Sequence, residues 1–191
     1  MKTLLQINSG MQGQESHSSM LANRMTNSLL AQMPGAKHIK RDLSEEEIPH
    51  LNLGVFQSFS DPDSAVTPTQ KAALALSNTL VAELKQSSIL IIGAPMYNFM
   101  IPSVLKSWID HVIRAQETFR YGENGPVGLL ENKKTYIVIA QGGKFLGTEA
   151  DIETEYLKMA LGLIGITDIE FIYAQGLAMG PQGAEVGLKE A

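Results

Sequence analysis

The residues of this chain best suited to chemistry are amides, hydroxyls and aromatic rings that follow apolar runs. The densest group is Gly93-Ala94-Pro95-Met96-Tyr97-Asn98-Phe99, which comes directly after the apolar residues 89–92. Small residues at the end of a buried strand leave room for a ligand, and an aromatic ring beside an amide can hold a flat polar ring. We therefore interpret this segment as one wall of a cofactor site.

Two further segments combine small and polar residues in the same way. Residues 9–18 contain no Lys or Arg, but Ser hydroxyls and the N–H groups at the start of a helix can bind a phosphate. The alternative is that Ser16 or Ser18 is only an N-cap. Gln141-Gly142-Gly143 follows another apolar run, and glycine lets a ligand approach the backbone closely, although an ordinary tight turn would use the same residues.

Other chemistries find little support in the sequence. Residues 9–18 lack a G-x-G-x-x-G pattern, and Gly143-Lys144 lacks the flanking residues of a phosphate-binding Walker motif. Asp110 and His111 are neighbours on a predicted helix, so they cannot face each other as a catalytic pair. The four histidines show no metal-ligand spacing: His17, His38, His50 and His111. Hydrogen-bond donors and aromatic rings without an acid–base pair suit a cofactor that carries its own chemistry, and we expect no metal.

Length and composition indicate a single globular domain, which we expect to span residues 1–191. Of these residues 44% are hydrophobic and 18% are charged, and the formal net charge of −5 argues against nucleic acid or an anionic membrane as a partner. The N-terminal apolar run is too short for a secretory signal, and no segment approaches the ~20 apolar residues of a membrane helix. The chain has no cysteine, which fits a reducing compartment, so we expect a cytoplasmic protein.

The elements that must position these loops alternate between strands and helices. Short apolar runs predict strands at residues 4–7, 89–92, 135–140 and 169–173. Residues 36–43 are predicted as a weaker second strand, which Lys37, Lys40 and Arg41 make ambiguous. Helical spacing predicts helices at about residues 18–33, 67–86, 102–114, 151–163 and 181–189. Thr67-Pro68-Thr69-Gln70 predicts a capping box with proline at the first helical position. Residues 44–66 are predicted to be a long irregular excursion with room for a helical turn, and residues 116–132 a glycine-rich loop.

This alternation predicts a three-layer, doubly wound α/β fold with a five-stranded parallel sheet in the order 2-1-3-4-5. In such folds, ligands bind outside the carboxyl ends of the strands, where the strand order reverses. For this order the nearest loops follow strands one, three and four. Those are the three loops rich in Ser, Gly, Asn and Gln, so fold and composition predict the same site.

Taken together, these motifs resemble those of the FMN-dependent NADH:quinone oxidoreductases, also called azoreductases, which have a flavodoxin-like fold. The resemblance covers nearly the whole chain. It is carried by Ala94-Pro95-Met96-Tyr97-Asn98-Phe99, Phe119-Arg120-Tyr121 with Glu123-Asn124-Gly125-Pro126, Leu161-Gly162-Leu163-Ile164-Gly165-Ile166 and Ser16-His17-Ser18. It implies an enzyme that binds FMN, takes a hydride from NADH and reduces quinones or cleaves azo compounds in a ping-pong cycle. It also implies a homodimer with the active site at the subunit interface.

The resemblance further implies roles for individual residues. Ser16, His17 and Ser18 would bind the FMN phosphate, and the rest of the cofactor site would surround the ribityl chain and the ring. The implied cofactor-binding residues are Ser9, Gly10, Ser16, His17, Ser18, Met96, Tyr97, Asn98, Phe99, Ala140, Gln141, Gly142 and Gly143. The implied substrate-binding residues are Asn98, Phe119, Tyr121 and Leu163. No side chain is assigned as a general acid or base, because the flavin carries the chemistry.

Three positions depart from the pattern of that family. Gly10 stands in place of a second serine, Gln141 in place of an arginine, and Leu163 in place of the aromatic residue of some relatives. An aromatic pair is worth about 0.5–1.5 kcal/mol, so the change at Leu163 should weaken stacking on flat substrates. We expect these departures to alter substrate preference rather than flavin binding.

Two alternative functions remain compatible with the sequence. One is a flavodoxin-type electron carrier, which binds FMN but turns over no small substrate. The other is a non-catalytic binding domain, since this architecture hosts many functions. NADH is expected as donor rather than NADPH, because residues 51–67 contain no Lys or Arg for a 2′-phosphate, although Arg114 and Arg120 could serve that role.

Overall fold

A five-stranded parallel sheet forms the centre of the computed structural model, which describes residues 2–191. Its strands are β1 (Thr3–Asn8), β2 (Lys37–Asp42), β3 (Ile89–Pro95), β6 (Lys134–Ala140) and β7 (Ile169–Ala174). They are paired in the order β2-β1-β3-β6-β7, and all neighbours run parallel. The predicted fold class and the predicted strand order are therefore confirmed.

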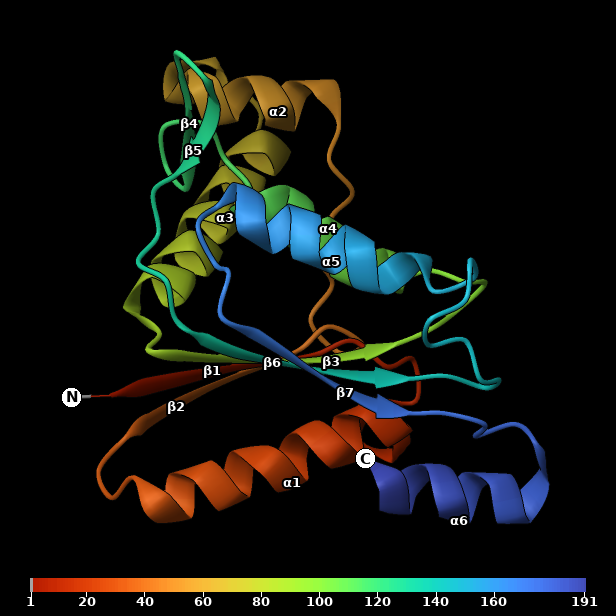
Figure 1. Ribbon diagram of the computed structural model, residues 1–191. Coiled ribbons are helices and arrows are strands. Elements are labelled where there is room, and N and C mark those ends of the chain that lie inside the picture. The colour runs from red at the N-terminus through yellow and green to blue at the C-terminus, as the bar shows by residue number, and fades with distance from the viewer. Residues whose placement is uncertain (1) are drawn as a thin grey trace.

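Helices cover both faces of this sheet, as Figure 1 shows. One face carries α1 (His17–Gln32) and α6 (Gly180–Glu190). The other face carries α3 (Pro68–Gln86), α4 (Ser103–Val112) and α5 (Ile152–Leu163). Strands and helices begin and end within three residues of the predicted bounds. The capping box is present as predicted, because Thr67 Oγ1 accepts from the Gln70 N–H at 3.2 Å and Gln70 Oε1 accepts from the Thr67 N–H at 2.9 Å.

Two segments predicted as irregular contain regular structure. Within residues 44–66 the chain forms α2 (Leu53–Ser60), whose N-cap Asn52 accepts from the Val55 N–H at 3.1 Å, and a short 3₁₀ helix at Pro62–Ser64. The prediction of a loop at residues 116–132 was wrong. There the chain forms an antiparallel hairpin of β4 (Phe119–Gly122) and β5 (Gly125–Gly128).

The glycines of this hairpin serve close packing, which explains the error. A Cβ atom at Gly128 would lie 2.2 Å from the backbone nitrogen of Gly165, just after α5. Gly125 has φ +117, a conformation that side chains disfavour and that closes the turn between the strands. Glycine in this segment therefore indicates a tight turn and a backbone contact rather than an irregular loop.

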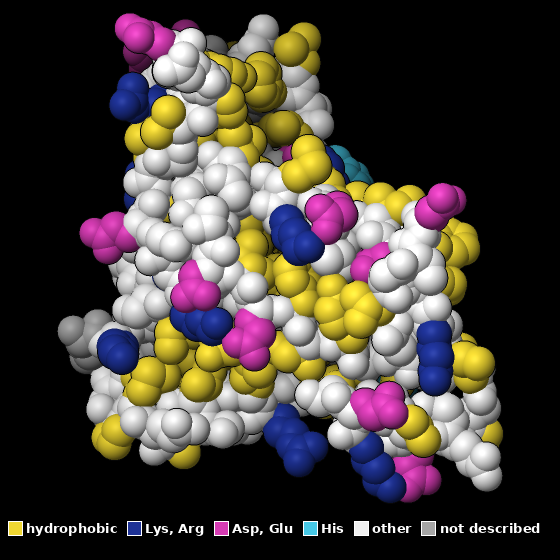
Figure 2. All heavy atoms as spheres, in the orientation of Figure 1, with side chains coloured by type: hydrophobic (Ala, Val, Ile, Leu, Met, Phe, Trp, Pro, Cys, Tyr) yellow, Lys and Arg dark blue, Asp and Glu magenta, His cyan; other side chains and the backbone are white. Residues whose placement is uncertain are grey.

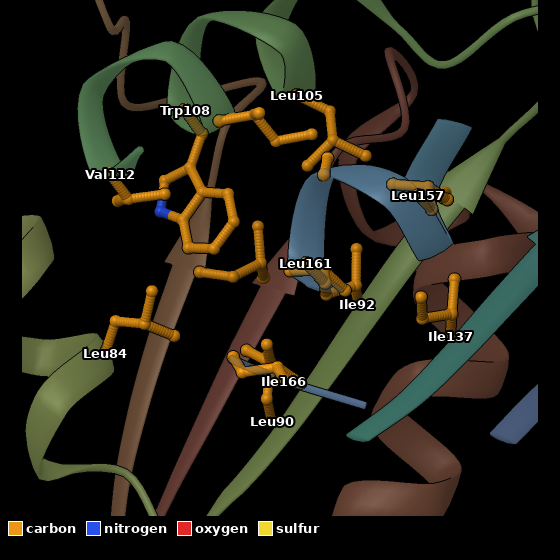
Figure 3. Close-up of a cluster of buried hydrophobic side chains, with 14 of the residues drawn as sticks. Leu84, Leu90, Ile92, Leu105, Trp108, Val112, Ile137, Leu157, Leu161 and Ile166 are labelled. Carbon is orange, nitrogen blue, oxygen red and sulfur yellow. The ribbon is translucent and has the colours of Figure 1, made fainter. Parts of the chain in front are cut away.

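Two hydrophobic cores fix the sheet against its helices. The larger core lies under α3, α4 and α5, where Trp108 of α4 packs with Leu84 of α3 and Leu161 of α5 (Figure 3). The smaller core lies under α1 and includes Leu4, Ala22, Ile91 and Val138. Each fully buried large aliphatic side chain contributes about 1.5–3 kcal/mol, so the sheet is a firm base for the loops at its edge.

Candidate cofactor site and the neighbouring apolar groove

The loops that follow β1, β3 and β6 contact one another at the carboxyl edge of the sheet. The Met11 N–H in the first loop donates to the Tyr97 hydroxyl in the second at 3.2 Å. The Met96 N–H in the second loop donates to the Ala140 carbonyl at the end of β6 at 2.9 Å. The structure thus brings together the three loops that the sequence analysis selected.

Ser9 and Gly10, at the start of the first loop, hold the backbone in place. The buried Ser9 hydroxyl donates to the Gly93 carbonyl at 2.7 Å, which ties the end of β1 to β3. A Cβ atom at Gly10 would lie 2.2 Å from Ser16 Oγ. A second serine here would therefore displace Ser16, so this departure from the family pattern makes room for the Ser16 side chain.

Hydrogen-bond donors are left unpaired at the start of α1. Ser16 occupies the N-cap position, but its hydroxyl accepts from the Gln12 N–H at 3.2 Å and makes no capping bond to the first turn. His17 Nδ1, Ser18 Oγ and Ser19 Oγ are buried and have no hydrogen-bond partner among residues 2–191. Leaving a polar group in this state costs about 1–3 kcal/mol. Because the start of a helix also favours negative charge, this cluster is suited to a phosphate.

The second loop has an unusual backbone at its tip. Tyr97 and Met100 exchange two backbone hydrogen bonds, of 2.9 and 3.1 Å, around Asn98 and Phe99. These two residues have φ of +53° and +64°, as in a type I′ turn, and for a side chain as large as that of Phe99 this costs of order 1–3 kcal/mol. Asn98 and Phe99 are exposed, so the turn presents an amide and a ring at the site.

The third loop presents backbone donors. Its carbonyls all accept from the segment after β7: Gln141 from Leu177 at 3.1 Å, Gly142 from Ala178 at 3.0 Å and Gly143 from Gly176 at 2.8 Å. The N–H groups of Gly142 and Gly143 have no acceptor within residues 2–191, so both can donate to a ligand.

Behind that loop lies a buried pair of side chains that the sequence analysis did not anticipate. Gln141 and Glu153 are both 0% exposed, and Gln141 Nε2 donates to Glu153 Oε1 at 3.3 Å. Burial raises the pKa of Glu153 to about 7. The Gln141 side chain therefore supports the loop from behind, and Gly142 and Gly143 are the residues of this turn that can touch a ligand.

Two residues of the site were missed by sequence reasoning although each stands beside a motif. Ser19 follows Ser16-His17-Ser18 and adds a second buried hydroxyl, beside that of Ser18, to the first turn of α1. Phe145 comes two residues after the double glycine, and its ring packs edge-on against Phe99 with centroids 5.6 Å apart. A Cβ atom at Gly143 would lie 2.7 Å from the Phe145 ring, so glycine is needed there for this contact.

The predicted substrate-binding residues lie in two neighbouring hollows. Phe119, Tyr121 and Leu163 line a mostly apolar groove of about 630 Å³ between α2, α4, α5 and the hairpin. Asn98 lines a different hollow of about 570 Å³ next to Tyr97, and Lys106 borders both. The structure thus brings three of the four together and places Asn98 with the cofactor loops.

The other titratable groups near the groove have structural roles. The buried His111 ring hydrogen-bonds the Pro49 carbonyl through Nε2 at 2.9 Å, and its burial lowers its pKa. Arg114 is buried over the Phe59 ring and donates to Asn78 Oδ1 at 2.6 Å. Within residues 2–191, no cluster of acidic or histidine side chains could hold a metal ion. Among the same residues, no helix combines the length and the hydropathy that crossing a membrane requires.

Comparisons with known proteins agree with this fold. A family model described as having a flavodoxin-like fold matches residues 1–191. The chain is 46% identical over 191 residues to FMN-dependent NADH:quinone oxidoreductase 6 of Burkholderia lata, covering 100% of this chain and 96% of that protein. Identity and coverage are the same for an FMN-dependent NADH:quinone oxidoreductase of Paraburkholderia phymatum. Among solved structures, an azoreductase from Bacillus anthracis superposes with a TM-score of 0.88 at 26% identity, covering 100% of this chain and 96% of that one.

Proposed function

This chain belongs to the flavodoxin-like family of FMN-dependent NADH:quinone oxidoreductases, and from that membership we propose that it carries two electrons from NADH to quinones through a bound FMN. The observation that carries the proposal is the set of unpaired donors at the carboxyl edge of the sheet. Among the described residues, the buried hydroxyls in the first turn of α1 and the N–H groups of the Gly142-Gly143 turn have no hydrogen-bond partner. Both are suited to an anionic cofactor with a polar ring edge.

The residues present fit FMN at both of its ends. His17, Ser18 and Ser19 would hold the phosphate at the start of α1, where the helix dipole adds to their hydrogen bonds. The turn of Tyr97, Asn98 and Phe99, the N–H groups of Gly142 and Gly143, and the Phe145 ring would surround the flavin. When bound, FMN would supply the redox chemistry, accepting a hydride from NADH and returning two electrons to the acceptor.

The protein itself contributes positioning and exclusion of water. Asn98 is exposed beside the cofactor loops, and its amide can both donate and accept, so it would orient the nicotinamide or the quinone. NADH and the quinone would bind at the same site one after the other. This order gives a ping-pong cycle and parallel lines in double-reciprocal plots. Cleavage of an azo compound to two amines requires four electrons and thus two such cycles.

We expect NADH rather than NADPH as the electron donor. Arg114 is buried and already bonded to Asn78, so it is not free to bind a 2′-phosphate. Arg120 is the remaining exposed candidate on the hairpin. We expect a preference for NADH, which an Arg120→Ala variant should leave unchanged; a strong NADPH activity that Arg120→Ala abolishes would assign Arg120 to the 2′-phosphate instead.

A second copy of the chain would complete the substrate site. Exposed apolar side chains line the groove and include Phe56, Tyr121 and Met159. Figure 2 shows hydrophobic side chains gathered over α2 and between α2 and the hairpin. Such a patch favours a protein partner. A homodimer through this face would bring the groove with Phe119 and Tyr121 of one copy toward the cofactor loops of the other.

An anaerobic absorption titration of the FMN-loaded protein with NADH tests this function. We expect the oxidised flavin band to bleach and to recover when a quinone is added. A bound flavin that NADH cannot bleach would instead indicate an electron carrier. Failure to take up FMN at all would leave a binding domain on this fold.

A further inference from the structure

A carboxyl group and an amide are buried together directly behind the third loop. Gln141 Nε2 donates to Glu153 Oε1 at 3.3 Å, and neither residue is exposed to solvent. The two remaining oxygens, Gln141 Oε1 and Glu153 Oε2, are also buried, and neither has a hydrogen-bond partner among residues 2–191. Both of these atoms are acceptors when Glu153 is ionised, so they cannot bond to each other. The pair therefore lacks a hydrogen atom that could form a hydrogen bond between these two oxygens.

A proton on Glu153 supplies that hydrogen. The neutral carboxyl O–H can donate to the amide oxygen of Gln141 while the amide N–H donates to the other carboxyl oxygen. The two side chains then form a closed pair with two hydrogen bonds and no buried charge. In the ionised state, two buried oxygens would stay unsatisfied and a charge would be buried without a counter-ion.

The charged groups around Glu153 favour the same state. Asp151 at the start of α5 repels a charge on Glu153, and Tyr173 faces it from β7 with its hydroxyl bonded to Thr154. Within residues 2–191, no Lys, Arg or His forms a salt bridge with Glu153. The N-terminus of α5 does favour a negative charge, but this effect is smaller than the cost of burying an ion. The pKa of about 7 reflects that balance.

Gln141 links this pair to the cofactor loop. Its N–H donates to the Ala174 carbonyl at 2.8 Å and its carbonyl accepts from the Leu177 N–H at 3.1 Å, so its backbone is fixed from β7 and the following segment. The Gly142-Gly143 turn follows Gln141 directly in the sequence. The orientation of its free N–H groups therefore depends on how firmly Gln141 is held.

We propose that Glu153 is a positioning residue, which holds a proton and through Gln141 keeps the Gly142-Gly143 turn in the conformation that binds the cofactor. The inference rests on the proposed FMN function. Loss of the proton breaks the closed pair and loosens the turn. FMN affinity should then fall as the pH rises through the pKa of Glu153.

The same proton has a consequence that requires no cofactor. The pKa of Glu153 is raised from 4.5 to about 7 in the folded protein, so the folded state binds more protons than the unfolded state between those values. The contribution of Glu153 to the stability of the FMN-free protein, taken as the difference between wild type and Glu153→Gln, should therefore decline as the pH rises from 4.5 to about 7 and then level off.

The experiment measures FMN dissociation constants by fluorescence quenching, and urea unfolding of the FMN-free protein, across this pH range for wild type and Glu153→Gln. A glutamine at 153 can form the same two hydrogen bonds with Gln141 but cannot titrate. We expect the wild-type dissociation constant to rise about five- to tenfold relative to Glu153→Gln between pH 6 and 8.5, which corresponds to about 1–1.4 kcal/mol. Ionisation of the FMN phosphate affects both proteins alike. Glu155→Gln, at an exposed position on the same helix, should behave as wild type.

Each outcome decides the question. Identical pH curves for wild type and Glu153→Gln in both measurements would overturn the proposal. A change in the stability curve alone would show a protonated pair that does not position the turn. If no protein binds FMN, the proposed function fails, and with it the positioning role, whereas the stability curve still reports on the pair. Should Glu153→Gln fail to fold, the carboxyl ¹³C shift of Glu153 in the wild type must titrate well above the ordinary range, or the inference is wrong.

Discussion

At the scale of single residues, the buried hydroxyls at the start of α1 give a prediction in which stability and binding move in opposite directions. Ser18 Oγ has no partner among residues 2–191, so Ser18→Ala removes an unsatisfied group and should raise the stability of the FMN-free protein by up to about 1 kcal/mol. A hydrogen bond to a charged phosphate would be lost at the same time, which weakens FMN binding about tenfold. Chemical unfolding and fluorescence titration measure the two effects.

The matched control for this prediction is Ser28→Ala, an exposed serine on the same helix that is distant from the first turn. It should change neither quantity. A Ser18→Ala protein that loses stability and keeps its FMN affinity would show that the hydroxyl serves the fold and does not bind the phosphate.

Asn98 allows a second test at this scale, because its backbone and its side chain can be separated. Its φ of +53° suits glycine, so Asn98→Gly should keep the turn and leave the stability equal or slightly higher. Loss of the orienting amide should lower kcat/KM for the quinone about tenfold, or about 1.4 kcal/mol. Asn98→Ala should show the same kinetic loss together with reduced stability, since alanine disfavours positive φ. Unchanged kcat/KM in both variants would remove Asn98 from the substrate site.

At the scale of elements, the hairpin is held against α5 by two facing glycines. A Cβ atom at Gly128 would lie 2.2 Å from the Gly165 nitrogen, so Gly128→Ala must displace the hairpin and should cost about 1–3 kcal/mol of stability. The hairpin carries Phe119 and Tyr121, so KM for the quinone should rise while the FMN dissociation constant stays within about twofold. Gly162→Ala is the control, because a Cβ atom there meets nothing within 4 Å and should stabilise α5 by about 0.5–1 kcal/mol. Equal effects of the two substitutions would contradict this account of the hairpin.

Elements of this chain are predictable where the signal is local. Apolar runs located β1, β3, β6 and β7, and Thr67 with Gln70 located the start of α3, whereas the basic residues of β2 made that strand a weaker prediction. The hairpin was missed because glycines that allow a backbone contact have the same composition as a loop. Contacts of that kind join residues far apart in sequence, so no local pattern reveals them.

The candidate site also has a part that the sequence predicts and a part that it does not. Its loops were predictable because the strand order decides which ends meet, and each of those loops has a distinctive composition. The pairing of Gln141 with Glu153 was not predictable, because an acidic residue in the first turn of a helix is common where that turn is exposed to solvent. Only the fold shows that this position is buried behind the third loop.

At the scale of the whole molecule, the apolar groove lies next to the hollow beside the cofactor loops, and Lys106 borders both. The groove is bordered by side chains that a monomer would expose to water, such as Tyr121 at 75% and Met159 at 74%. Specific dimers bury about 1,200–2,000 Å² with apolar side chains at the centre of the contact. A second copy on this face would cover the groove and shield bound substrate from water, which is why we link assembly to turnover.

Charge substitution at the centre of this face tests that link. In a monomer, Met159→Glu at so exposed a position should change stability by no more than about 0.5 kcal/mol. In a dimer it buries an acid in an apolar contact, so sedimentation should show monomers, quinone reduction should fall at least tenfold, and FMN should remain bound. Val186→Glu on α6, which covers the opposite face of the sheet (Figure 1), makes the same chemical change away from the groove and should leave assembly and turnover intact. A wild-type protein that sediments as a monomer at micromolar concentration and still reduces quinones would show that a single chain completes its own substrate site.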